Sequence, residues 1–222
     1  MNAFQAMSNL RIVRKYSDRE IDEKVVGLLL HMATHPISAG NLQPWEFVVV
    51  DEPETKSKIA HAALQLEHVA KAPLLVVVGA DIGKVALKYG KRGELVYAPQ
   101  DAIQAAQTIL ITAQAVGLGG DLIRAFDEVE LSGVVGFPDN IRPVAIIALG
   151  YPDEEGEEPD RIPFENLTHV NRFGNKINME FAPLSVVFEN VLSEFRQRMP
   201  VQTRPSMPNV KHFLTRFSHK HI

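Results

Sequence analysis

The sequence of 222 residues contains no cysteine. This absence excludes disulfide bonds, zinc sites held by thiolates, iron–sulfur clusters held by cysteine, and cysteine nucleophiles. It also excludes a small secreted scaffold that depends on disulfides for its stability. Any catalytic chemistry must therefore use other side chains or a bound cofactor.

Long hydrophobic runs are also missing. No apolar run approaches the about 20 residues that a membrane-spanning helix needs, and the opening MNAFQAMSNLRIVRKY lacks the basic stretch and apolar core of a signal peptide. The net charge of −4 gives no sign of a general affinity for nucleic acid or anionic membranes. With 45% hydrophobic and 23% charged residues, we expect a globular cytoplasmic protein that binds neither.

Several signatures of enzyme chemistry are incomplete. The run Gly117 to Gly120 is similar to a dinucleotide fingerprint, but Leu122 occupies the third glycine position and the run follows a helix. No phosphate loop is present, and no serine has the context of a nucleophile elbow. His31 and His35 have the spacing of a zincin helix without its glutamate, which favours ordinary histidines over a metal site.

Hydrophobic periodicity predicts helices that alternate with strands. Ser17 and Glu20 have capping-box spacing, so a helix is expected after them, up to Pro36. A second helix is expected to start at Pro53 and to run to about Leu66. The predicted strands are residues 46–51, 74–80 and 143–149. Residues 81–97 show no clear pattern, and the alternation indicates an α/β or α+β fold with one main sheet.

Residues 99–116 give the longest helical signal. Alanines and aliphatic residues lie on most faces of this segment, so we expect a deeply buried central helix. An acidic stretch, DEEGEEPD, then reads as an exposed loop, and a further amphipathic helix is predicted over 184–198. The expected organisation is a main domain at 1–180 followed by a helix and an extended arm at 181–222.

Two arginines and one loop are the candidate ligand-binding features. Arg11 and Arg14 are spaced so that both can point toward one anion, although a solvated basic segment explains the spacing as well. The loop of residues 38–45, SAGNLQPW, precedes a predicted buried strand. Its small residues allow close approach to a planar ligand, and its amide side chains offer hydrogen-bond donors and acceptors.

Taken together, these segments resemble the nitroreductase family of flavoenzymes over about residues 9–165. The elements occur in the family's order: an R-x-x-R-x-[YF] start, the S-A-x-N-x-Q-P-W loop with its following strand, an Ala-Pro pair, the end of the long helix, and an A-L-G-Y-P segment. They are found here at residues 11–16, 38–45, 72–73, 115–119 and 148–152. The resemblance implies an α+β fold with a central, mostly antiparallel sheet packed between helices and a C-terminal helical extension.

The resemblance further implies a homodimer that binds FMN in two clefts, each built from both subunits. Arg11 and Arg161 would meet the flavin phosphate, and Arg14 would approach the N1/O2 edge of the ring. Gln65 and His68 would lie near the pyrimidine or the ribityl chain. Residues 37–41 would come from the partner subunit, and backbone N–H groups of 119–121 would lie near N5. The expected cofactor-binding residues are Arg11, Ile12, Val13, Arg14, Ile37, Ser38, Ala39, Asn41, Gln65, His68, Gly119, Gly120, Asp121 and Arg161.

Two positions depart from the family pattern. Ile12 stands where the family often has a serine that touches the phosphate, so only its backbone is available there. Ile37 replaces a common proline, with Pro36 one residue earlier. The first departure would weaken the phosphate site, and the second would reshape the pocket around the ring.

The activity that the resemblance implies needs no catalytic side chain and no metal. NAD(P)H would reduce FMN, and an electron-poor acceptor such as a nitroaromatic or a quinone would then take the electrons in a ping-pong cycle. Two alternatives stay open: a flavin-binding protein with little turnover, and flavin chemistry such as dehalogenation or flavin fragmentation. The C-terminal arm is expected to pack on the partner subunit.

Overall fold

The structure is a computed structural model that describes residues 3–176. The helix predicted over 184–198 and the arm predicted from residue 181 lie outside the described residues. Two compact units divide the chain, Met1–Pro159 and Asp160–Ile222. The described part of the second unit holds the short helix η3 (Phe164–Asn166) and a bridge between His169 and Lys176.

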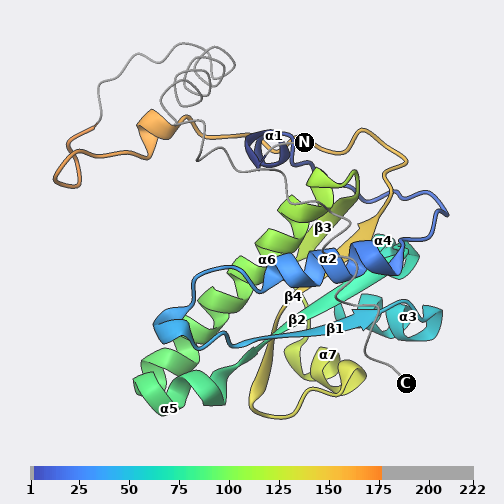
Figure 1. The fold of residues 1–222 in the computed structure, drawn as a ribbon, viewed down its shortest axis with the longest axis horizontal. Coiled ribbons are helices and arrows are strands. Elements are labelled where there is room, and N and C mark those ends of the chain that lie inside the picture. Colours follow the sequence, from blue (N-terminus) through green and yellow to red (C-terminus); the bar gives the residue numbers. More distant parts are fainter. Residues whose placement is uncertain (1–2, 177–222) are drawn as a thin grey trace, which may run out of the picture. The chain divides into compact units, whose positions relative to one another are not determined.

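A four-stranded sheet forms the centre of the first unit (Figure 1). The strands follow the order β1-β2-β4-β3, and every neighbouring pair is antiparallel. The three predicted strands are confirmed, and a fourth, β3, follows the long helix. The strand bounds are β1 Trp45–Val50, β2 Leu74–Asp81, β3 Gly119–Ile123 and β4 Ile141–Gly150. The observed architecture confirms the α+β fold.

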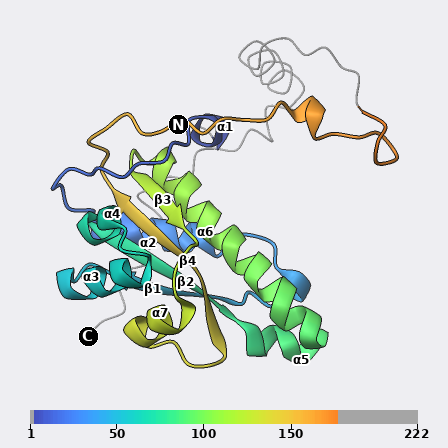
Figure 2. The same ribbon diagram turned by 180° about the vertical axis from the view of Figure 1, so that it is seen from behind.

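Helices cover both faces of the sheet (Figures 1 and 2). One face packs against α2 (Glu23–Ala33) and α6 (Ala98–Ala115). The other face packs against α3 (Pro53–Ala62), α4 (Glu67–Lys71) and α7 (Glu128–Val135). Successive strand residues point to opposite faces, so a strand covered on both sides is apolar without alternation. This arrangement explains the continuous apolar run of β2.

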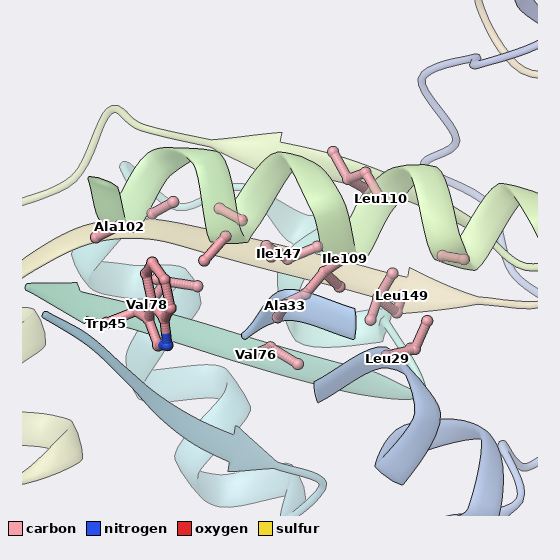
Figure 3. Close-up of a cluster of buried hydrophobic side chains, with 14 of the residues drawn as sticks. Leu29, Ala33, Trp45, Val76, Val78, Ala102, Ile109, Leu110, Ile147 and Leu149 are labelled. Atoms are coloured by element: carbon pink, nitrogen blue, oxygen red, sulfur yellow. The ribbon is translucent and has the colours of Figure 1, made fainter. Parts of the chain in front are cut away.

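The core between α6 and the sheet is built from interlocking aliphatic side chains (Figure 3). Val76 and Val78 of β2 point toward it from positions two residues apart, and Ile147 and Leu149 of β4 do the same. Ile109 of α6 lies over them and is fully buried. This packing fixes α6 across the sheet, and the position of α6 in turn fixes the segments at its two ends.

Helix α6 is buried along one face rather than all round. Eight of its 18 residues are buried: Ala98, Asp101, Ala102, Ala105, Ala106, Ile109, Leu110 and Ala113. Its opposite side is partly or fully exposed in a single chain, including Ile103 and Gln104, and Val116 beyond its end is 39% exposed. Within a single chain, the predicted deep burial is therefore found on one side of the helix only.

The predicted start of the first long helix is wrong. The cap of α2 is Asp22, whose carboxylate accepts a hydrogen bond of 2.8 Å from the N–H of Lys24. Ser17 instead donates its N–H to the carbonyl oxygen of Tyr151 at 2.9 Å, so this segment is held in an extended form. The capping-box spacing at Ser17 and Glu20 is thus coincidental, because a better cap lies five residues after Ser17.

The segment that starts at Pro53 forms two helices instead of one. Helix α3 ends at Ala62 because Leu64 and Gln65 adopt positive φ angles of 57° and 61°, which interrupt the helix before α4. The unassigned residues 81–97 contain α5 (Ile82–Arg92) and a π-helical turn, η2 (Gly93–Tyr97). The irregular φ of 58° at Gly90 accounts for the weak periodicity there.

Two short helices complete the described residues of the first unit, α1 (Ala3–Ser8) and η1 (Ala39–Asn41). Among the described residues, the helices are too short or too polar to cross a membrane.

Candidate functional site

The segment of residues 11–14 is held in place by backbone hydrogen bonds. The N–H of Val13 donates to the carbonyl oxygen of Gly120 at 3.1 Å, which joins the segment to β3. Ile12 and Glu157 exchange two backbone hydrogen bonds of 3.0 and 2.8 Å. Arg11 and Arg14, which flank Ile12 and Val13, therefore project from a fixed backbone.

The glycines of β3 permit this close packing. A Cβ atom on Gly119 would lie 2.6 Å from the side chain of Val13, and one on Gly120 would lie 2.6 Å from the carbonyl oxygen of Ala148. Neither position has room for a side chain. The last two glycines of the run thus begin a packed strand, and the low strand propensity of glycine explains why the sequence did not predict it.

Arg14, His68 and Asp121 meet beside β3. Asp121 Oδ2 accepts a hydrogen bond of 3.1 Å from Arg14 Nε. His68 Nε2 also lies 3.1 Å from this oxygen, but the contact lacks the alignment of a hydrogen bond, so the buried nitrogen has no hydrogen-bond partner. Burial lowers the pKa of His68, and the attraction of Asp121 opposes this effect. At neutral pH the site therefore contains an uncharged imidazole whose buried Nε2 lies against a carboxylate oxygen without a well-aligned hydrogen bond.

Carboxylates from the acidic loop form ion pairs with both arginines. Arg11 Nη2 lies 3.0 Å from Glu158 Oε2, and Arg14 Nη1 lies 3.3 Å from Glu157 Oε2. Glu154 accepts hydrogen bonds from the backbone N–H groups of Arg14 and the next residue at 2.7 and 3.1 Å. These bonds lower the pKa of Glu154. The sequence identified the loop only as exposed and missed its pairing with the arginines, although the opposite charges were a signal for it.

Tyr16 also helps to hold the segment of residues 11–14 in place. Its hydroxyl donates a hydrogen bond of 2.6 Å to the carbonyl oxygen of Val13, and its ring fills the space that a Cβ on Gly150 would need. Burial raises the pKa of Tyr16, so the hydroxyl stays protonated as a donor. The aromatic position of the R-x-x-R-x-[YF] pattern therefore has a structural role here, which was not predicted.

The loop of residues 37–41 is built around the start of α6. The N–H of Ala39 donates a hydrogen bond of 2.9 Å to Asp101 Oδ2, and Ser38 Oγ accepts one of 2.9 Å from the N–H of Gln43. Burial raises the pKa of Asp101, and the bond from Ala39 opposes this shift. Ile37 stands outward with 88% of its surface exposed. Asp101, which anchors the loop, was not among the predicted site residues.

The predicted site residues form two separate groups in one chain. Residues 11–14, His68 and 119–121 gather beyond the last turn of α6, whereas 37–41 lie at its first turn. At 1.5 Å per residue, the helix separates the groups by roughly 20 Å or more. Gln65 is exposed in the turn before α4, and Arg161 is an exposed residue of the second unit.

Comparison with known proteins shows which family the chain resembles. Residues 9–81 and 60–151 match the nitroreductase family. An NADH dehydrogenase from Thermus thermophilus is 30% identical over 194 residues, which cover 75% of this chain and 95% of that protein. A protein from Archaeoglobus fulgidus named NADH dehydrogenase/NAD(P)H nitroreductase is 32% identical over 164 residues, 68% of this chain and 91% of its own length.

A solved structure shows the same fold. A protein from Staphylococcus epidermidis described as an NAD(P)H:FMN oxidoreductase superimposes with a TM-score of 0.69, over 76% of this chain and 95% of its own, at 18% identity. The chain thus belongs to the nitroreductase family. It is an enzyme of the NAD(P)H nitroreductase and oxidoreductase class.

Proposed function

We propose that the chain binds FMN non-covalently and works as an NAD(P)H-dependent oxidoreductase with the flavin between two subunits. The observation that carries this proposal is the fixed pair Arg11 and Arg14, of which Arg14 shares the carboxylate of Asp121 with the buried Nε2 of His68. When bound, FMN supplies a centre that takes a hydride from a reduced nicotinamide and passes electrons to an acceptor.

The residues of the first group fit the phosphate end and one ring edge of FMN. Guanidinium groups bind phosphate with two parallel hydrogen bonds, and Arg11 keeps 27% of its side chain exposed for such a contact. Arg14 adds a second cation, and the hydrogen bond that it donates to Asp121 raises its pKa, so the charge is permanent. His68 Nε2 offers an unused hydrogen-bonding group. Arg161 stays a predicted second phosphate ligand.

The second group fits the ring itself. Residues 38–40 are small, and Gly40 and Asn41 adopt positive φ angles of 59° and 57°, which turn the backbone sharply at this point. Because this group lies at the opposite end of α6, one chain has no means of placing both groups around one ring system. A two-fold pairing along the exposed side of α6 would bring the second group of one chain to the first group of its partner.

This pairing would also cover exposed apolar surface. Val116 lies 39% exposed just beyond α6, and Met7 of α1, which packs on α6, is 59% exposed. An apolar surface of this kind beside a half-covered helix is typical of an interface between subunits. We therefore propose a homodimer with two flavin sites.

The chemistry would place few demands on side chains. Arg14 would stabilise negative charge on the ring, neutral His68 would hold a hydrogen-bonding atom, and the loop of residues 37–41 would orient the ring and exclude water from one side. Electron-poor acceptors such as nitroaromatics and quinones are the proposed substrates.

The absorbance of the purified protein and its steady-state NAD(P)H oxidation test the proposal together. A yellow protein that oxidises NAD(P)H only when an acceptor is present supports it. Bound flavin without turnover would instead indicate a flavin-binding protein. Turnover of flavin or of a halogenated substrate without NAD(P)H would indicate the other alternative, and a colourless protein that does not take up FMN would contradict the proposal.

A further inference from the structure

Helix α5 gathers positive charge on a chain that is acidic as a whole. Its eleven residues include Lys84, Lys88, Lys91 and Arg92 and contain no acid. Lys91 pairs with Glu94 at 2.9 Å. In the part of the chain that the structure describes, the other three cations have no carboxylate within ion-pair distance. By contrast, Arg11 and Arg142 each have one such carboxylate, and Arg14 has two.

Two of these cations lie directly against the loop that contains residues 37–41. Lys84 Nζ donates a hydrogen bond of 3.3 Å to the carbonyl oxygen of Gln43. A Cβ atom on Gly40 would lie 2.5 Å from Lys88 Nζ and 2.5 Å from the Tyr89 hydroxyl. The two ammonium groups therefore converge on the backbone of this loop.

Two tyrosines support the cations at the end of α5. Tyr89 and Tyr97 pack edge to face, with ring centroids 5.3 Å apart. Lys88 Nζ lies 5.5 Å from the ring centroid of Tyr89, and Arg92 donates a hydrogen bond of 2.8 Å to the hydroxyl of Tyr97. Rings beside cations restrict their rotamers and lower the entropic cost of binding an anion. Lys84, Lys88 and Arg92 are called the α5 cluster below.

We propose that the α5 cluster binds a phosphate of the nicotinamide dinucleotide that reduces the enzyme. This inference rests on the proposed function, because the loop of residues 37–41 would line the ring that the nicotinamide must reach. A dinucleotide extends well beyond its nicotinamide, so its phosphates must lie on the protein beside the ring site. Unpaired lysine and arginine side chains are the groups that bind such phosphates.

The phosphate has two possible sources in the dinucleotide. The pyrophosphate is common to NADH and NADPH, whereas the 2′-phosphate exists only in NADPH. A contact with the pyrophosphate affects both reductants equally, and a contact with the 2′-phosphate gives a preference for NADPH. Kinetics with both reductants therefore distinguishes them.

The test is the KM for NADPH and for NADH of the FMN-loaded double variant Lys84→Gln/Lys88→Gln, with an uncharged quinone as acceptor. We expect a roughly fivefold to twentyfold rise in KM, because exposed charged contacts contribute about twofold to fivefold each. The matched control is Lys24→Gln, which removes an exposed lysine from α2 with no carboxylate within ion-pair distance. Its KM values should equal those of the unaltered enzyme.

A rise for NADPH alone assigns the 2′-phosphate, and an equal rise for both assigns the pyrophosphate. Unchanged KM values for both reductants, or an equal rise in the control variant, would overturn the inference. Flavin content, measured by absorbance, and the binding of NADP⁺, measured by equilibrium dialysis, separate the two proposals. Weaker NADP⁺ binding with full flavin content locates the defect in the α5 cluster, whereas a flavin-free unaltered protein contradicts the proposed function itself.

Discussion

Arg11 and Arg14 are the side chains on which the flavin proposal depends most, and each is held by carboxylates. Glu158 lies on Arg11, while Glu157 and Asp121 lie on Arg14. The proposed flavin phosphate would therefore have to replace a carboxylate that is 73% exposed and weakly bound. This competition sets expectations for substitutions on both sides of the pair.

Replacing Arg11 with alanine should weaken FMN binding and leave riboflavin binding unchanged. The variant loses one charge-assisted contact, on the order of 1.5–3 kcal/mol or tenfold or more in affinity, and leaves Glu158 without its counter-charge. Fluorescence titration of the apoprotein with each flavin measures both constants. An unchanged FMN constant would remove Arg11 from the phosphate site, and an equal loss for riboflavin would point to a folding defect.

Replacing Glu158 with glutamine should have the opposite effect. Because the carboxylate no longer competes for Arg11, FMN should bind about twofold to fivefold more tightly, whereas riboflavin should not. Glu155→Gln is the matched control, since Glu155 is exposed in the same loop and carries the same charge. Equal tightening in the two variants would show a general charge effect and no specific competition at Arg11.

Replacing Arg14 with alanine should lower the reduction potential of the bound flavin. Its guanidinium would favour the anionic reduced ring, and its removal leaves Asp121 as an uncompensated negative charge nearby. Flavin content should change less than in the Arg11 variant. Potentiometry with a reference dye gives the shift, and a raised or equal potential would count against the placement of Arg14.

Among the secondary-structure elements, strong hydrophobic patterns predicted well and locally irregular segments did not. The strands at residues 46–51, 74–80 and 143–149 were found because burial on both faces makes them continuously apolar. β3 was missed because its two glycines suppress the strand signal, and they are required only by the close approach of Val13 to Gly119 and of the Ala148 carbonyl oxygen to Gly120. Such a requirement comes from tertiary contacts, which a single sequence does not display.

The candidate site, like the secondary structure, was predicted only in part from the sequence. Ordered motifs identified residues 11–14 and the Ser38–Asn41 loop, and the structure joins the first of these to Asp121 and His68. The motifs included Asp101 only as the residue that opens the long helix and did not predict its contact with the loop or the pairing of the three glutamates, because these contacts link segments that are more than 60 residues apart in sequence. The assignment of all these residues to a flavin site stays a prediction, including that of Gln65 and Arg161.

The hydrogen bond between Ala39 and Asp101, which joins the loop of residues 37–41 to α6, makes the stability of the protein depend on pH. Burial raises the pKa of Asp101 above its usual 3.8, so the native state binds this proton more tightly than the unfolded state does. The carboxylate therefore costs stability increasingly as the pH rises from the usual aspartate pKa through the raised one. Asp101→Asn removes the charge but keeps an oxygen for the N–H of Ala39.

We accordingly expect the Asn variant to be more stable than the unaltered protein at about pH 7, with a smaller difference at about pH 4. Denaturant unfolding at both pH values measures this. Asp101→Ala, which also loses the acceptor, should be less stable than the Asn variant at both. If the difference in unfolding free energy between the Asn variant and the unaltered protein does not grow with pH, the pKa of Asp101 is not raised in the folded state.

In the molecule as a whole, the length of α6 has a direct functional consequence. The groups that we propose to bind the flavin phosphate and to line its ring lie at its two ends, so the proposed flavin site would need the second group from another chain. The exposed side of α6 and the apolar surface near Met7 and Val116 offer the contact for such a partner. The central claim is therefore that the dimer binds FMN and the monomer does not.

Sedimentation velocity of the purified protein, followed at both protein and flavin wavelengths, tests this claim most directly. At low micromolar concentration we predict one species of about twice the 24.7 kDa chain mass that carries all of the flavin absorbance. Deleting residues 181–222 tests the predicted arm separately, since an unchanged dimer would show that the arm is not part of the interface. A monomer that carries bound FMN would contradict the account.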